Sequence, residues 1–420
     1  KKIVQDDGLR TGLRDRTFAY SDTVLKSGLI PPVNHNLAEF VRKSASSPLT
    51  ANNTVKLLLN GEEKFPEVLK ALESAEHHIH LEYYIYEEDA TGKSIADVLI
   101  RKAQQGVEVR FMYDDFGSNG LSKTFIQNLE AAGVQTAPFY KIKILALASR
   151  LNYRNHRKII VVDGNTSFVG GINMSERYRN DRNNKDHLFW RDTHLQLTGT
   201  ATLYLQYLFL CDWNFCSNHA MVYHSNYFSQ PTPVTEITGE IVQLVPSGPD
   251  SDLPVIFYSL LEAIGAAKKK ILITTPYFIP GESLMDVLII AAQGGLKVQL
   301  LVPGNSDSKL VDAAARSYYT ELLKYGVEIF LYHKGFVHAK TMVIDDDLSI
   351  IGSANMDYRS FDLNFEINAL VYGKKIAEQL DSAFVKDLKE SSIIDAQQWL
   401  ARPKYMHLWE KIVRLVSPFL

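Results

Sequence analysis

The sequence repeats one order of predicted elements in its two halves, and this repeat limits the folds that the chain can adopt. Each half holds an apolar run, a helical pattern and a strand-like run, followed by a second helix and a second strand. These elements fall at 55–59, 68–72, 79–86, 95–105 and 106–109 in the first half, and at 241–245, 256–264, 271–279, 284–293 and 295–298 in the second. Helical patterns that alternate with short β-branched runs are typical of α/β modules. We therefore predict an α/β fold of two modules that face each other about a pseudo-two-fold axis, with a cleft at the seam.

A polar stretch with Pro231 and Pro233 separates the two halves and predicts a linker. The 420 residues are enough for two domains with separate cores. We expect an N-terminal segment at 1–52, a first module at 53–216, the linker at 217–240, and a second module at 241–420 that ends in an amphipathic segment. The chain begins with Lys1 and not with Met, which favours a chain shortened at its start.

Charge and cysteine content exclude some classes of protein. The net charge is −3, which argues against a protein whose main task is to coat nucleic acid. The two cysteines, Cys211 and Cys216, do not indicate a disulfide framework, and they are compatible with a reducing compartment. Because no apolar run reaches 18 residues, we predict no membrane-spanning helix, and the start shows no secretory signal pattern.

Each half also carries the pattern His-x-Lys-x4-Asp. The residues are His156, Lys158 and Asp163 in the first half, and His338, Lys340 and Asp345 in the second. Small residues and an Asn follow each pattern, and the Asn lies 17 residues after the His in both copies, at Asn173 and Asn355. The alternative is a pair of duplicated strands whose His and Lys are only surface residues. The shared spacing to the Asn makes that accident improbable, so we predict a duplicated functional site.

The spacing within the motif suggests a role for each position. On a strand, His and Lys two residues apart project from the same face, while the apolar residues between and after them pack into the core. Asp163 and Asp345 should lie at turns, where they brace the site. The small residues before Asn173 and Asn355 let the backbone approach closely, so these amides can donate to a phosphate oxygen.

By these motifs the chain resembles the phospholipase D superfamily, and within it the bacterial cardiolipin synthases. The resemblance runs from about Asn53 to the end. Further stretches with the same resemblance are 77–84, 151–155, 190–194, 245–250, 275–280, 316–319 and 357–360. The departure is at the front, where the family usually carries hydrophobic membrane segments that this sequence lacks.

The resemblance implies a two-step displacement with the active site at the seam between the modules. One His attacks phosphorus, and the other protonates the leaving alcohol and later deprotonates the incoming one. By family analogy we assign attack to His156 and acid/base catalysis to His338, and the pseudo-symmetry leaves the reverse assignment open. Lysines and asparagines of the motifs would hold the phosphate oxygens, so that neither a metal nor a cofactor is needed. The resemblance makes Asp192 and Glu366 the carboxylates that orient the histidines; otherwise they are exposed carboxylates on a strand.

The implied activity is that of a cardiolipin synthase, which transfers a phosphatidyl group between two phosphatidylglycerol molecules and releases glycerol. Alternatives are a phospholipase D-type hydrolase, a transferase with another donor such as phosphatidylethanolamine, a nuclease, or an inactive lipid-binding scaffold. The expected partners are the phospholipid substrate and a membrane surface, without nucleic acid, and the oligomeric state stays open. The expected location is the bacterial cell membrane, with the catalytic modules on its cytoplasmic side.

Three other features have two interpretations. His78, His80 and Glu82 would share one strand face, but no second group at metal spacing accompanies them, so we prefer a structural or cleft-lining role. The apolar segment 141–150, which has basic flanks and no counterpart in the second half, fits a membrane-interface segment. The C-terminal stretch 408–419 fits one as well, although such helices often pack on their own domain.

Overall fold

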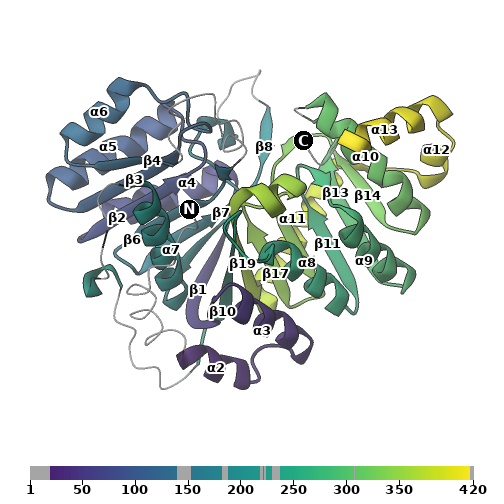
Figure 1. Cartoon of the computed structure of the whole chain (residues 1–420), viewed down its shortest axis with the longest axis horizontal. Coiled ribbons are helices and arrows are strands. Elements are labelled where there is room, and N and C mark those ends of the chain that lie inside the picture. Colours follow the sequence, from purple (N-terminus) through teal and green to yellow (C-terminus); the bar gives the residue numbers. More distant parts are fainter. Residues whose placement is uncertain are drawn as a thin grey trace.

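The computed structural model describes residues 19–139, 153–181, 188–217, 221, 224–228, 237–306 and 308–416. The predicted membrane segment at 141–150 therefore lies outside the described residues. So do parts of the N-terminal segment, of the linker and of the C-terminal stretch. Two α/β halves lie side by side, with helices on their outer faces (Figure 1).

Sixteen of the described strands form one hydrogen-bonded sheet in which the two modules repeat the same strand order, and four others form two short two-stranded sheets. From the centre outward, the first module contributes β1 (Thr50–Leu59), β9 (Thr193–Thr198), β7 (Thr166–Gly170), β6 (Lys158–Val162), β2 (His78–Tyr83), β3 (Glu108–Asp114) and β4 (Gln135–Phe139). The second contributes β10 (Glu240–Ser247), β19 (Asn364–Tyr372), β17 (Leu348–Gly352), β16 (Thr341–Ile344), β11 (Lys270–Thr274), β13 (Lys297–Pro303), β14 (Glu328–Tyr332) and β20 (Ser391–Ile393). This repeated order confirms the prediction of two similar α/β modules.

The helices follow the same repeat. In the first module they are α4 (Asn60–Glu73), α5 (Ala90–Gln104) and α6 (Lys123–Ala131), and in the second α8 (Val255–Ala266), α9 (Glu282–Gln293) and α10 (Lys309–Lys324). One further helix follows the last strand of each repeat, α7 (Thr200–Cys216) and α11 (Lys374–Lys389). Each apolar pattern identified in the sequence thus corresponds to an element.

The two modules meet through strand pairing and through packing. β1 and β10 are antiparallel neighbours, with Thr50 opposite Val242. β7 also contacts β19, and β9 contacts β17, so the two halves of the sheet also pack on each other. Helix α7 covers this junction, because it contacts both β1 and β10. Residues 201–213 of α7 are all buried, as expected of a helix that is apolar on every side.

The segment before the first module packs on the second module. Helices α2 (Ala19–Lys26) and α3 (His35–Ser44) share a hydrophobic core with α8, through side chains such as Leu37 and Val41. The buried Gln243 of β10 donates to the carbonyl oxygens of Ala38 and Ser47 at 3.0 and 3.1 Å. The predicted division at residue 52 falls inside β1, which begins at Thr50. The domain boundaries themselves remain predictions.

The two motif aspartates brace turns that lie away from the motif histidines. Asp163 and Asp345 have left-handed backbones, with φ of 51° and 54°. The Asp163 carboxylate accepts three backbone N–H groups, from residues 76, 77 and 78, each at 2.8 Å. Asp345 accepts the N–H groups of residues 268, 269 and 270 at 2.7–3.2 Å. Each Asp therefore fastens the β6–β7 or β16–β17 turn to the start of β2 or β11.

We expect Asp345→Ala to lower the free energy of unfolding by about 1–3 kcal/mol, because three backbone donors lose a charged acceptor. Asp346→Ala is the matched control, since the carboxylate of Asp346 pairs with the side chains of the exposed Lys269 and the partly buried Lys270 and accepts none of these backbone N–H groups. Urea unfolding followed by circular dichroism gives both values. An equal loss in the two variants would contradict the bracing role.

Candidate active site

Both motif histidines lie just after a short strand that pairs with the opposite module. His156 follows β5 (Arg154–Asn155), which is parallel to β19, and His338 follows β15 (Gly335–Val337), which is parallel to β8 (Phe189–Arg191). The N–H of His156 donates to the carbonyl of Phe365 at 2.8 Å, and that of His338 to the carbonyl of Arg191 at 2.7 Å. The expectation that His and Lys share one strand is therefore wrong. The strand is interrupted at the His, because the chain there pairs across the seam.

A buried carboxylate from the opposite module contacts each histidine. Nδ1 of His156 lies 2.9 Å from Oε1 of Glu366, and Nδ1 of His338 lies 2.7 Å from Oδ2 of Asp192. Both carboxylates are completely buried, whereas the histidine side chains are 15% and 13% exposed. A carboxylate can only accept here, so Nδ1 carries the proton and Nε2 is left to act on a substrate. The two predicted orienting residues thus serve the histidine of the other repeat.

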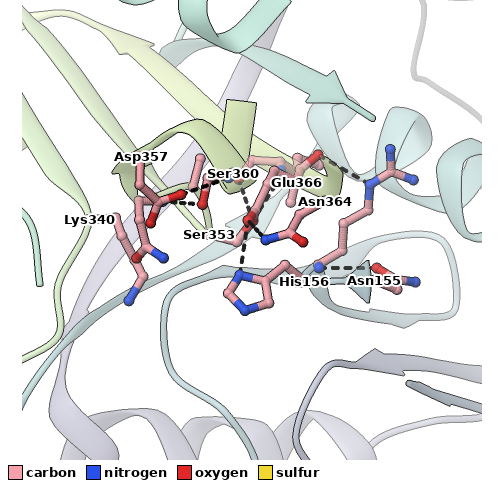
Figure 2. Close-up of polar contacts among 12 residues, drawn as sticks. Asn155, His156, Lys340, Ser353, Asp357, Ser360, Asn364 and Glu366 are labelled. Carbon is pink, nitrogen blue, oxygen red and sulfur yellow. Dashed lines mark hydrogen bonds and ion pairs between the residues drawn. The ribbon is translucent and has the colours of Figure 1, made fainter. Parts of the chain in front are cut away.

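Further hydrogen bonds hold Glu366 in place (Figure 2). The hydroxyl of Ser353 donates to Oε2, and the amide of Asn364 donates to Oε1 at 3.3 Å. Burial alone would raise the pKa of Glu366, but His156 and Lys158 lower it below its usual value. The pKa of Asp192 is likewise lowered, because Lys340 and His338 outweigh its burial. Both carboxylates therefore stay ionised and can stabilise the positive charge that an imidazole gains during a reaction.

The motif lysines lie beside the histidines and are almost fully buried. Nζ of Lys158 donates to the carbonyl of His156 at 2.6 Å, and Nζ of Lys340 donates to the carbonyl of His338. Nζ of Lys340 is also 2.9 Å from Nδ1 of His338. Burial lowers the pKa of Lys158 to about 8 and that of Lys340 to about 7, against the effect of the nearby carboxylates. When protonated, both ammonium groups can bind an anion, and a bound anion would in turn favour their charged forms.

The motif residues meet at one pocket of about 380 Å³ between the modules. Its lining includes His156, Lys158, Asn173, His338 and Asn355, and Lys340, which is not among the lining residues, contacts His338. The amide of Asn173 donates to the hydroxyl of Tyr178 at 2.8 Å. Asp163 and Asp345 do not line it. The structure therefore brings together both histidines, both lysines and both asparagines, and places the two aspartates elsewhere.

Several lining side chains were given no role from the sequence. They are Tyr84, Arg154, Arg177, Tyr178, Trp190, Tyr277 and Arg359. The ring of Tyr84 lies 4.1 Å from that of His156, between centroids, and Trp190 lies 5.5 Å from His338. The sequence does carry a signal for Arg177 and Arg359, because each follows the motif His of its own repeat by 21 residues. For Tyr178 there was none, because the matching position of the second repeat is Ser360.

His78, His80 and Glu82 of β2 belong to a buried network of hydrogen bonds. The amide of Gln206 on α7 contacts His78 at 2.9 Å and His80 at 2.8 Å, and Arg110 contacts His80 at 3.1 Å. Glu82 accepts from the amide of Asn155 at 2.6 Å. None of these residues lines the pocket, so of the two roles expected from the sequence, structural or cleft-lining, they have the structural one. Within the described residues, no group of three or more His, Cys, Asp or Glu could hold a metal ion.

The electrostatics of the pocket fit a reaction at an anionic phosphorus centre. Burial lowers the pKa of His338 to about 4, with a further lowering by Lys340, and burial also lowers the pKa of His156. Both imidazoles are thus neutral in the free protein and able to act as bases or nucleophiles. A bound phosphodiester would raise these pKa values, because it adds a negative charge beside them. One His can then carry the proton that a leaving alcohol needs.

Two α/β modules whose paired His-x-Lys motifs share one pocket define a phospholipase D-like protein. The family model described as "Cardiolipin synthase, PLD-like domain" matches residues 68–204 and 260–388. The chain belongs to this cardiolipin synthase family. In the described residues, no helix is both long and apolar enough to cross a membrane.

Curated relatives agree with this assignment, and a solved structure shares the fold. The chain is 43% identical over 389 residues to a cardiolipin synthase of Geobacillus kaustophilus, covering 93% of this chain and 77% of that protein. It is 41% identical over 388 residues to the major cardiolipin synthase ClsA of Bacillus subtilis, covering 92% and 80%. The fold is similar to phosphatidylserine synthase of Haemophilus influenzae, with a TM-score of 0.67 at 15% identity, over 92% of this chain and 100% of that one.

We expect tungstate, an oxyanion analogue of phosphate, to bind tightly below pH 7 and more weakly above it. The ammonium of Lys340, with a pKa of about 7, must be charged to bind the anion. The affinity should therefore fall by up to about tenfold per pH unit above pH 7, until Lys340 titrates in the complex as well. Titration calorimetry between pH 6 and 9 measures this. Lys340→Met should bind more weakly and lose the dependence near pH 7, whereas a wild-type affinity that stays constant would contradict the assignment.

Proposed function

We propose that the protein is a cardiolipin synthase, which transfers a phosphatidyl group from one phosphatidylglycerol to another and releases glycerol. The observation that carries the proposal is the pair of histidines, each held by a carboxylate of the opposite module, that face one pocket. Membership of the cardiolipin synthase family supports the same activity. The reaction passes through a covalent phosphatidyl-histidine.

In the first step, Nε2 of His156 attacks the phosphorus of the donor lipid. The bond between phosphorus and the oxygen of the headgroup glycerol breaks, and His338 gives its proton to that oxygen. In the second step, His338 removes the proton from a hydroxyl of the acceptor, the new P–O bond forms, and the bond from phosphorus to His156 breaks. One phosphodiester replaces another of similar energy, so the exchange requires no energy-rich cofactor.

The other motif residues stabilise the charge that develops on the phosphate. Lys158 and Lys340 supply positive charge at the non-bridging oxygens, and the amides of Asn173 and Asn355 supply hydrogen bonds. Glu366 and Asp192 stabilise the imidazolium that each displacement produces.

Incubation of the purified protein with phosphatidylglycerol in mixed micelles and a chelator should yield cardiolipin and an equal amount of glycerol. His156→Ala and His338→Ala should each lower the rate by at least about a thousandfold, because nucleophile and acid/base act as a unit. His333→Ala, which removes an exposed histidine, is the matched control and should keep the wild-type rate.

The products decide between this activity and its alternatives. Phosphatidic acid as the main product would make the protein a hydrolase. Turnover only with phosphatidylethanolamine as donor would make it a transferase of another specificity. Loss of cardiolipin synthesis on addition of the chelator would contradict the role given to the lysines.

We further propose that the protein works at the bacterial cell membrane, on its cytoplasmic side, and contacts the lipid surface through α13 (Lys404–Val416). Tyr405, Trp409 and Ile412 are 68%, 57% and 49% exposed, and their spacing places them on one face of this helix. Helix α13 packs on α10, whose Val311 lines the pocket. An apolar and aromatic stripe beside a lipid-binding pocket suits an interfacial helix. Neither Cys211 nor Cys216 is part of a disulfide, which suits the cytoplasmic side.

The double variant Trp409→Ser/Ile412→Ser should bind vesicles of phosphatidylglycerol at least about tenfold more weakly, because two apolar side chains no longer enter the interface. Sedimentation with vesicles measures the binding. The control is Ile290→Ser on α9, which removes an apolar side chain that is 69% exposed on another helix. Equal weakening by the control would contradict a docking role for α13.

A further inference from the structure

Three arginines line the pocket beyond the groups that the proposed reaction uses at its phosphorus centre, and two of them, Arg154 and Arg359, form no ion pair among the described residues. Arg154 precedes His156 on β5, and Arg359 follows the second motif Asn by four residues; both line the pocket. Burial raises the pKa of Tyr84 to about 12, and the charges of Arg154 and Arg359 both act against this rise. Both arginines and Tyr84 line the same pocket.

The guanidinium of Arg154 is buried without an ion-pair partner among the described residues. The residue is 5% exposed, its Nη1 donates to the carbonyl of Tyr153 at 3.1 Å, and its guanidinium lies 4.4 Å from the ring centre of Phe116. The charge of Asp114 acts on Arg154, but the Asp114 oxygens accept backbone N–H groups of residues 116, 117 and 155. A buried charge without a close counter-ion is costly, so this position favours a bound anion.

Arg359 differs from its counterpart in the first repeat. Arg177, the matching residue, forms an ion pair with Glu87. Within the part of the chain that the structure describes, Arg359 forms no ion pair. Arg154 has Phe336 at the matching position of the second repeat, two residues before the motif His. The duplicated site is therefore asymmetric, with two uncommitted guanidinium groups in one pocket.

One acidic side chain, Asp357, lies among the described residues that line the pocket. Its Oδ1 accepts the N–H of Ser360 at 2.7 Å, as Figure 2 shows. Burial raises the pKa of Asp357, although the hydrogen bonds from Ser360 oppose the rise. The motif lysines lie beside the ionised Glu366 and Asp192, and Arg177 pairs with Glu87. Arg154 and Arg359 are therefore the guanidinium groups of the pocket for which the described residues supply no ion-pair partner.

We propose that Arg154 and Arg359 form a second phosphate subsite, which binds the phosphate that the acceptor phosphatidylglycerol already carries. This inference rests on the proposed function and names the residues that would recognise the acceptor lipid. In the second step the acceptor hydroxyl attacks the phosphorus on His156, the P–N bond breaks, and His338 takes the proton. The second phosphate undergoes no reaction and lies one glycerol away from the first. Guanidinium groups suit this role because they bind phosphate oxygens in a bidentate manner.

The subsite can be tested by comparing the efficiencies with which the protein uses two water-soluble acceptors. Glycerol and glycerol 3-phosphate both offer hydroxyls, but only the second carries a phosphate. With phosphatidylglycerol as donor, the wild type should use glycerol 3-phosphate at least about tenfold more efficiently than radiolabelled glycerol, as kcat/KM. In Arg154→Gln/Arg359→Gln this preference should fall to about one, while the exchange of glycerol stays within about threefold of wild type. Because both acceptors are measured on the same sample, partial misfolding does not change the ratio.

The outcomes separate the subsite from the proposed function. A wild type that makes cardiolipin but shows no preference for glycerol 3-phosphate overturns the subsite alone. An equal loss of preference in Arg177→Gln also overturns it, because that result would indicate only the total charge of the pocket. A wild type that makes no cardiolipin and exchanges no glycerol overturns the proposed function instead.

Discussion

Each motif histidine is held by the module that does not carry it, and the rest of the site depends on this exchange. The backbone of His156 is bonded to β19 and its side chain to Glu366 on the same strand, while His338 is bonded in the same way to Arg191 and Asp192. Neither module alone can therefore orient its own motif histidine. The β1–β10 pairing and the buried helix α7 keep the two halves in the register that these contacts need.

The electrostatics of the pocket follow from the same arrangement. Two lysines and two histidines are buried next to two ionised carboxylates, so burial lowers the pKa of the cations while they keep the carboxylates charged. A phosphodiester entering this pocket brings the negative charge that raises those pKa values again. The substrate thereby supplies part of the protonation state that its own cleavage requires. Around this symmetric centre, Arg154 and Arg359 introduce an asymmetry that suits two different lipid substrates.

Much of the fold and half of the site could be predicted from the sequence, because duplication makes a pattern visible twice. The two modules, the motif positions and the bracing role of Asp163 and Asp345 all followed from repeated spacing. Repetition could not show that Asp192 serves His338, since a repeat does not say which copy contacts which. It also could not indicate Tyr178 or Arg154, whose counterparts are Ser360 and Phe336. These residues acquire their roles only when the two halves meet.

The most direct test of the central claim is to trap the covalent intermediate. Donor phosphatidylglycerol with a radiolabelled phosphate would be mixed with the protein, quenched within milliseconds, and the labelled peptide identified by mass spectrometry. The account predicts an acid-labile, base-stable label on His156, which disappears in His156→Ala. A label on His338 would reverse the two histidine roles while keeping the cross-module site. Cardiolipin formation at the full rate without any labelled histidine would contradict the covalent mechanism.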